Sequence, residues 1–204
     1  MTKERILNIA SIEFSKHGYH AVSMSSLVKL LDVNKATIYY HYKDKKALYQ
    51  EVLKASLFDF RENREHFLDG IADPKEKFHL YLKGFLHTIK EKPHTMGLWL
   101  HEVAKFGSNM DESLTSIVEE MVDFLQELLN QLPLKDEYKS CSPYMIFSII
   151  HGSINNFYTI EMSPLPIDNK SELKLDADKT LNYLDEFLSS FILNAICKEG
   201  DKNV

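Results

Sequence analysis

Hydroxyl, imidazole and ammonium groups crowd the short stretch from Asn34 to Lys45. Thr37 and Tyr40 lie three residues apart, so on a helix their hydroxyl groups project from one face. Such groups can hydrogen-bond to base edges in a major groove, and the Thr37 methyl group suits the methyl of thymine. Lys45 adds positive charge at a helix N-terminus, where the helix dipole already favours phosphate. These residue types at this spacing predict recognition of double-stranded DNA.

Two short helices joined by a tight turn must position these side chains. Ser23 supplies the N-cap oxygen of the first helix, Asp32 makes the turn, and Asn34 caps the second helix. Ile38 and Tyr42 share the face of the second helix that packs on its neighbours, which turns the polar face outward. A helix-turn-helix with one polar outer face is the arrangement that inserts into a major groove.

The motifs along this stretch form a specific pattern. They are Gly18-Tyr19, Ser23-Met24, Val33-Asn34-Lys35-Ala36-Thr37, Ile38-Tyr39-Tyr40-His41-Tyr42, Lys45 and Leu48. With these motifs, residues 22–48 resemble the TetR family of bacterial transcriptional regulators. The resemblance covers roughly the first quarter of the chain. Two positions depart from it, because Asp32 stands in place of the usual glycine and Val28 in place of a common alanine.

The resemblance implies a role for each matching residue. The recognition-helix positions that meet base edges and nearby phosphates are occupied by Lys35, Ala36, Thr37, Tyr39 and Tyr40. The positions that contact the DNA backbone are occupied by Ser23, Ser25, His41 and Lys45. The competing interpretations are a capping role for Thr37, a packing role for Tyr40 and a solvated lysine run around Lys45.

The predicted reading face lacks arginine, so the bidentate contact to guanine is missing and one copy should discriminate weakly. A homodimer that reads two half-sites of a near-palindromic operator would restore specificity. The resemblance assigns the dimer contact to the last two predicted helices. Their apolar stripe comprises Ile146, Ile150, Ile154, Phe157, Leu184, Leu188 and Phe191. Periodicity leaves open the alternative that this stripe is intramolecular core.

Charge is divided unevenly along the chain. Residues 1–54 hold nine Lys/Arg against five Asp/Glu, a balance of +4, whereas residues 55–204 hold fifteen against twenty-five, a balance of −10. The basic front suits contact with phosphates although the whole chain carries −6. Cys141 and Cys197 lack metal-type spacing and fit a reducing compartment, and no apolar run is long enough to span a membrane. We therefore expect a cytoplasmic protein.

Apolar residues recur at three- and four-residue spacing throughout the chain, which predicts an all-α fold. An N-terminal three-helix helix-turn-helix DNA-binding domain is predicted at residues 1–48, and a larger helical ligand-binding and dimerisation domain at residues 49–204. The helices predicted beyond the helix-turn-helix span residues 45–69, 74–92, 93–106, 111–132, 142–162 and 176–198. An irregular stretch is expected from Pro164 to Leu175.

A small-molecule site is expected in the larger domain. On helices that surround the effector pocket in the resembled family, bulky side chains come from Phe85, Met96, Trp99, Phe124 and Phe157. His151 and Asn156 could add polar contacts inside an apolar cavity. The abundance of aromatic and Met residues predicts a largely apolar effector of unknown identity. Each of these residues, taken alone, is more often ordinary core.

Other chemistries find little support in the sequence. His79 and His87 lie eight residues apart, which is too far for one metal ion without a ligand from a third element. The chain lacks a nucleophile elbow, a phosphate-binding glycine loop and a paired-carboxylate pattern, so neither a cofactor nor catalysis is expected. The predicted function is a ligand-responsive, homodimeric repressor released from its operator by the effector. The alternative is an all-helical small-molecule carrier that does not read DNA.

Overall fold

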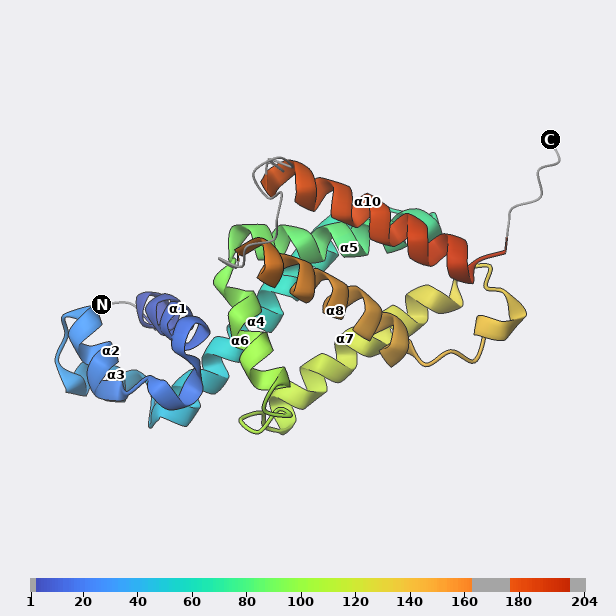
Figure 1. The fold of residues 1–204 in the computed structure, drawn as a ribbon. Helices are drawn as coiled ribbons and strands as arrows, with labels where there is room; N and C mark the ends of the chain where they lie inside the picture. Colours follow the sequence, from blue (N-terminus) through green and yellow to red (C-terminus); the bar gives the residue numbers. More distant parts are fainter. Residues whose placement is uncertain (1–2, 163–176, 199–204) are drawn as a thin grey trace. The chain divides into compact units, whose positions relative to one another are not determined.

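The computed structural model describes residues 3–162 and 177–198, and side chains are described for residues 3–157 and 183–198. Within these ranges nearly all regular structure is helical, and a single isolated β-bridge joins Leu134 to Cys197 (Figure 1). The predicted all-α fold is therefore confirmed. The irregular stretch expected from Pro164 to Leu175 lies outside the described residues.

The helices follow one another along the chain with short connections. They are α1 (Lys3–Ala21), α2 (Met24–Leu31), α3 (Lys35–His41), α4 (Lys45–Leu68), α5 (Pro74–Glu91), α6 (His94–Val103), α7 (Glu112–Asn130), the short 3-10 helix η1 (Asp136–Tyr138), α8 (Pro143–Met162) and α10 (Ala177–Ile196). Most predicted bounds agree with these to within one or two residues. The predicted helix at residues 93–106 is an exception, because Phe106 and Gly107 have φ of 54° and 68° and end α6 early.

The chain divides into two compact units. Unit 1 comprises Met1–Glu62 and Thr88–Glu119, and unit 2 comprises Asn63–His87 and Glu120–Val204. Unit 1 thus contains α6 as well as the three N-terminal helices, and α4 runs through both units. The predicted division into a DNA-binding domain at residues 1–48 and a ligand-binding domain at residues 49–204 stays a prediction. The two compact units are defined by how densely residues pack, which does not test where each function lies.

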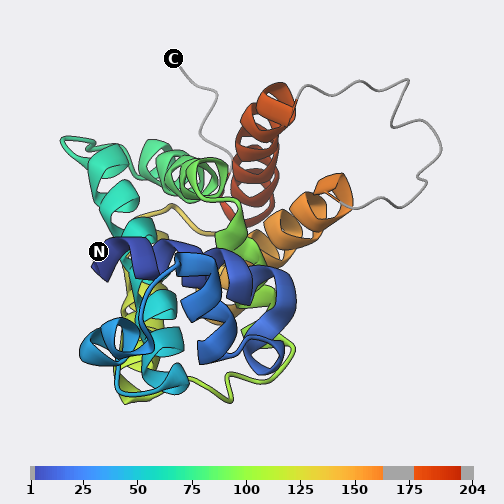
Figure 2. The same cartoon turned by 90° about the vertical axis from the view of Figure 1, so that its left-hand side faces the viewer.

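The core of unit 1 lies where α1, α2, α3 and the first half of α4 meet, and Figure 2 looks at these helices. Its fully buried side chains include Ile6, Phe14, Leu27, Leu31, Ile38, Leu48 and Tyr49. Phe14 packs edge-on against Tyr49, with 4.8 Å between ring centroids. Burying an apolar side chain of this size stabilises a fold by about 1.5–3 kcal/mol, so α1 is firmly attached to α4.

Helix α6 is held closely against α1 and α4 within unit 1. A Cβ atom on Gly97 would lie 2.9 Å from the Ser15 carbonyl oxygen, so only glycine allows this approach. The His101 ring packs against Gly18, whose φ of 73° interrupts the helical backbone of α1. The next residue of α6, the buried Glu102, accepts a hydrogen bond of 3.0 Å on its carboxylate from the Tyr49 hydroxyl of α4.

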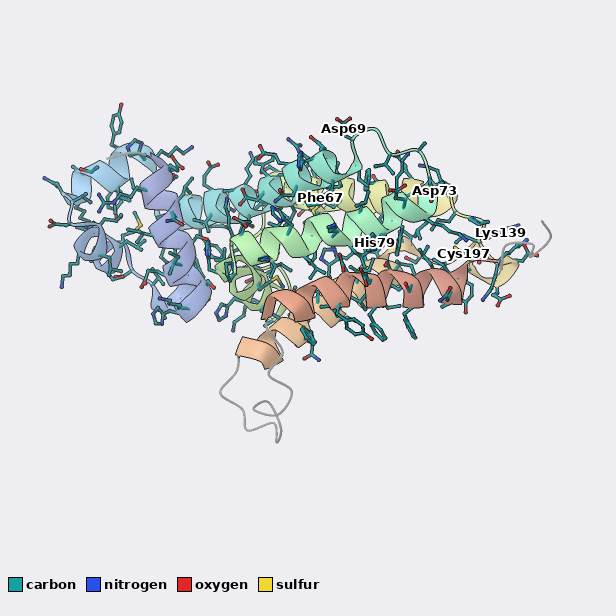
Figure 3. The ribbon with its side chains drawn as sticks, turned by 90° about the horizontal axis from the view of Figure 1, so that it is seen from above. Phe67, Asp69, Asp73, His79, Lys139 and Cys197 are labelled. Atoms are coloured by element: carbon teal, nitrogen blue, oxygen red, sulfur yellow. The ribbon has the colours of Figure 1, made fainter. Side chains whose placement is uncertain are left out.

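Unit 2 is built from α5, α7, α8, α10 and the end of α4. Its buried side chains include Phe78, Leu82, Leu125, Leu128, Ile146, Ile150, Ile154, Leu188 and Ile192. His79 of α5 faces α10, with its Nδ1 atom 3.0 Å from the Ser189 hydroxyl (Figure 3). Gly84 brings α5 close to α4, because its Cβ position lies 3.5 Å from the Arg64 Cα atom.

The stripe predicted for the dimer contact was partly wrong in its residues. Ile146, Ile150 and Ile154 of α8 are buried within the described chain, and so is Leu188 of α10. Phe191, by contrast, is 61% exposed. The sequence could not separate these faces, because apolar residues surround the first turns of α8 on nearly all sides.

Candidate nucleic-acid interface

Helix α2 and the turn that follows it set the frame for α3. Ser23 and Ser26 form a capping box, in which the Ser26 amide donates to Ser23 Oγ at 3.0 Å and the Ser23 amide donates to Ser26 Oγ at 3.1 Å. Asp32 ends α2 in the left-handed conformation, with φ 52° and ψ 53°. Aspartate tolerates this region better than most residues other than glycine, so the departure from the family's glycine leaves the turn intact.

Helix α3 presents one buried and one exposed face. Asn34 caps it by accepting a hydrogen bond from the Ala36 amide at 3.0 Å. Ile38 is fully buried and Tyr42 is 3% exposed, so these two side chains hold the helix against the unit 1 core. Both the caps and the inward face were predicted, and the structure confirms them.

The outward face of α3 carries the residues predicted to read DNA. Lys35 and Ala36 are exposed, Tyr39 is 42% exposed and Tyr40 is 85% exposed. Thr37 and His41 are half-buried on the same helix, which brings all six predicted α3 residues onto one short element. The Lys35 ammonium lies 5.5 Å from the centroid of the Tyr39 ring, so the two side chains form one cationic and aromatic surface.

Two predicted backbone contacts lie at the start of α2. Ser25 is exposed, and Ser23 is exposed as well. The Ser23 hydroxyl is already part of the capping box, so any phosphate contact would have to share it. Lys29 of α2, Lys43 between α3 and α4, and Lys46 of α4 are also exposed, so unit 1 carries further positive charge near these helices in the sequence.

Lys45 has a structural role that its sequence position did not reveal. Its ammonium group donates hydrogen bonds of 2.9 Å to the carbonyl oxygens of both Tyr19 and Val22. It also lies 4.3 Å from the centroid of the Tyr19 ring. Lys45 therefore attaches the end of α1 to the start of α4, and its predicted phosphate contact would use its remaining N–H.

The residues predicted to bind an effector are divided between the two units. Met96 and Trp99 belong to unit 1, where Met96 is buried and the Trp99 indole donates to Ser56 Oγ at 3.0 Å. Phe85, Phe124, His151, Asn156 and Phe157 belong to unit 2. Asn156 is exposed and Phe157 is half-buried.

His151 lies within an aromatic group of unit 2. Its ring centroid is 4.1 Å from that of Phe85 and 3.8 Å from that of Phe147. Its Nε2 atom is buried without a hydrogen-bond partner in the described part of the chain. Burial lowers the pKa of His151 to about 3, so the imidazole is neutral at physiological pH.

Two polar side chains near Phe124 were missed by the sequence reasoning. The Arg64 guanidinium lies 4.2 Å from the Phe124 ring centroid, and the Tyr81 ring lies 6.0 Å from it. Arg64 Nε and the Tyr81 hydroxyl are both buried, and among the described residues neither has a hydrogen-bond partner. In the sequence Arg64 has the pattern of an ordinary surface charge on α4, and only the tertiary packing places it inside.

Within the described ranges, no group of three or more His, Cys, Asp or Glu side chains could hold a metal ion. None of the helices in those ranges is long and apolar enough to cross a membrane.

Comparison with known proteins finds one family match and several similar transcriptional regulators. Residues 6–52 match the family described as bacterial regulatory proteins, tetR family. The chain is 24% identical over 158 residues to the HTH-type transcriptional regulator QacR of Staphylococcus aureus, a match that covers 77% of this chain and 84% of that protein. It is 38% identical over 78 residues to the HTH-type transcriptional regulator UidR of Escherichia coli, covering 35% of this chain and 40% of that protein.

The fold agrees with these matches. The ketosteroid transcriptional regulator KstR2 of Mycobacterium tuberculosis superimposes with a TM-score of 0.71 at 14% identity, over 96% of this chain and 95% of that one. The capped helix-turn-helix, its exposed polar face and the matched residues 6–52 coincide in unit 1. The helix-turn-helix of residues 6–52 therefore belongs to the TetR family of bacterial regulatory proteins, and the chain is a DNA-binding transcriptional regulator.

Proposed function

We propose that the chain is a homodimeric repressor that binds a near-palindromic operator through α3 and leaves it when a small, largely apolar effector binds. The observation that carries this proposal is the outward face of α3. Tyr40 is 85% exposed although a tyrosine gains from burial, and it shares this short helix with Lys35 and Thr37, while Ile38 on the opposite side is fully buried. A free aromatic and cationic surface on such a helix suits a DNA groove.

The contacts divide by chemistry in this proposal. Thr37, Tyr39 and Tyr40 offer hydroxyl groups to base edges, and Ala36 lets the helix approach closely because its side chain is small. Backbone phosphates are contacted by Lys35, His41, Ser23, Ser25 and Lys45. Phosphate contacts position the helix, whereas base contacts specify the sequence.

Exposed aromatic side chains on α10 support the homodimer. Tyr183, Phe187 and Phe191 are 66%, 49% and 61% exposed, and their rings stack successively with centroid separations of 6.1 and 6.0 Å. On α8, Met145 and Ile149 are 59% and 44% exposed. Apolar side chains gathered in this way mark an interaction surface, and a second copy of α8 and α10 would cover it.

The effector site is proposed in unit 2, around Phe85, Phe124, Phe157 and His151. Aromatic rings supply an apolar lining there, and the neutral His151 imidazole supplies one hydrogen-bonding group. The buried Arg64 and Tyr81 atoms are further polar groups for the effector, because a buried polar atom without a partner costs about 1–3 kcal/mol. The other three predicted residues are left out of this proposed site, because Met96 and Trp99 belong to unit 1 and Asn156 is exposed.

Selection of bound duplexes from a random pool, followed by sequencing, tests this proposal. A dimer with two α3 helices should enrich an inverted repeat whose half-site centres lie about one helical turn, or a multiple of it, apart. Adding an effector found by ligand screening should reduce the bound fraction. Failure to enrich any sequence would contradict the proposal and favour a small-molecule carrier.

A further inference from the structure

Unit 1 contains an open groove that the proposed function does not use. Its volume is about 560 Å³, which is within the range of about 300–1,000 Å³ usual for small-molecule sites. Three segments line it. Helix α1 contributes Glu4, Arg5, Leu7, Asn8 and Ser11, and α4 contributes Val52, Ala55, Ser56 and Asp59. The third segment consists of Lys92, which precedes α6, and of His94 and Thr95 in the first turn of α6.

The lining combines an apolar part with hydrogen-bonding groups. Leu7, Val52 and Ala55 provide the apolar part, while Asn8 and Ser11 provide an amide and a hydroxyl. Ser56 is already engaged, because its hydroxyl donates to the Leu53 carbonyl at 2.6 Å and accepts from the Trp99 indole at 3.0 Å. A flat molecule with an apolar face and polar edges matches this distribution.

The charges along the groove balance. Glu4 and Asp59 carry negative charge, and Arg5 and Lys92 carry positive charge. The Lys92 ammonium and the Asp59 carboxylate form an ion pair of 2.7 Å at one end. Burial and the neighbouring Lys92 lower the pKa of His94, against the opposing effect of Asp59, so this imidazole is neutral at physiological pH. A neutral lining gives no advantage to a charged ligand.

We propose that this groove is a second small-molecule site, for an uncharged ring compound of nucleoside size that carries several hydroxyl or amide groups. Such a compound would contact α1, α4 and α6 at once. Ile38 and Tyr42 pack α3 on the unit 1 core, and directly after α3 Lys45 attaches α4 to the end of α1, so the occupied groove favours one arrangement of the reading helix. Linkage then requires that the compound and operator DNA change each other's affinity by the same factor.

Saturation-transfer NMR on the full chain tests the site with two uncharged probes, adenosine and phenyl β-D-glucoside, and one anionic probe, adenosine monophosphate. The uncharged probes are expected to bind with dissociation constants in the millimolar range or below, at least about tenfold more tightly than the anion. The variant Asn8→Trp, which fills the groove from an exposed position, should abolish their signals. Lys16→Trp, exposed two turns further along α1, is the matched control and should retain them.

Two results would overturn the site: no transfer to either uncharged probe, or equal signals in the wild type and Asn8→Trp. The proposed effect of the bound compound on DNA binding is measured separately, as the affinity of the chain for operator DNA with and without a saturating concentration of probe. A change of about threefold or more in the wild type, absent in Asn8→Trp, is expected. An unchanged affinity would remove the regulatory role. Because probe binding is measured without DNA, it stands or falls independently of the proposed repressor function.

Discussion

Lys45 shows how one side chain can serve both the fold and the predicted DNA contact. Its two hydrogen bonds to the Tyr19 and Val22 carbonyl oxygens join segments that are more than twenty residues apart. The sequence places Lys45 in a lysine run at a helix start, which predicts contact with phosphate equally well. Only the folded position of the α1 end reveals the second role.

The Lys45→Ala variant should therefore lose stability as well as DNA affinity. Removing two charge-assisted hydrogen bonds from a partly buried ammonium is expected to cost about 1–3 kcal/mol of unfolding free energy. Chemical denaturation measures this cost. Lys46→Ala, at an exposed neighbouring position, should weaken DNA binding without changing stability. Equal stability of the two variants would show that the carbonyl contacts contribute nothing.

His151 gives unit 2 a defined dependence on pH. Its pKa is lowered to about 3 in the folded chain, against about 6.5 for an unperturbed histidine, so the unfolded state binds the proton more readily. The contribution of the neutral His151 to the free energy of unfolding is fully present above the unfolded pKa of about 6.5. It is lost progressively as the pH falls below that value. The free energy of unfolding should therefore decrease by at most about 1.4 kcal/mol per pH unit on acidification.

Comparing denaturation midpoints at pH 7 and pH 5 checks this expectation. His151→Phe keeps an aromatic ring between Phe85 and Phe147 but removes the titrating group, so its midpoint should fall less on acidification. His20→Phe, at an exposed position, is the control and should behave as the wild type does. An identical pH response in His151→Phe would contradict the assignment.

At the scale of single elements, α6 is the helix whose position the sequence predicted least well. Its first residue was predicted to within one position, but its end and its attachment to the DNA-reading unit were not. That attachment depends on Gly97 against Ser15 and on Glu102 against Tyr49, and these are contacts between residues far apart in the sequence. Local periodicity carries no information about such pairs.

Gly97→Ala should separate α6 from α1. The added Cβ would lie 2.9 Å from the Ser15 carbonyl oxygen, and backbone cannot move away as a flexible side chain can. We expect a loss of about 1–3 kcal/mol, measured by denaturation. Gly84→Ala in α5 is the matched control, since its nearest contact of 3.4 Å should be tolerated with little loss. Similar losses in both variants would argue against a close α1–α6 contact.

The exposed aromatic row of α10, which consists of Tyr183, Phe187 and Phe191, is tested at the same scale. Phe191→Glu should place a charge in the proposed dimer contact and shift the chain to monomers, as measured by light scattering after gel filtration. Phe106→Glu serves as the control, because Phe106 is 98% exposed in the turn after α6 and does not belong to the aromatic row of α10. A Phe191→Glu variant that stays dimeric would exclude this face.

At the scale of the whole molecule, the number and order of the described α-helices followed from the sequence, because capping residues, prolines and apolar spacing are local signals, whereas the short 3-10 helix η1 was not predicted. The two caps of the helix-turn-helix, Ser23 and Asn34, are examples. Three features did not follow: the inward face of α8, the burial of Arg64 and the groove in unit 1. Each arises where separate helices meet, so no single segment encodes it.

The central claim is that α3 reads a DNA sequence, and fluorescence anisotropy tests it most directly. A labelled duplex from the region upstream of the chain's own coding sequence is titrated beside a scrambled duplex. The wild type should bind the first at least about a thousandfold more tightly, and Thr37→Ala should lose about 1–3 kcal/mol on that duplex only. Equal affinity of the wild type for both duplexes, or an equal loss on both in Thr37→Ala, would contradict the account.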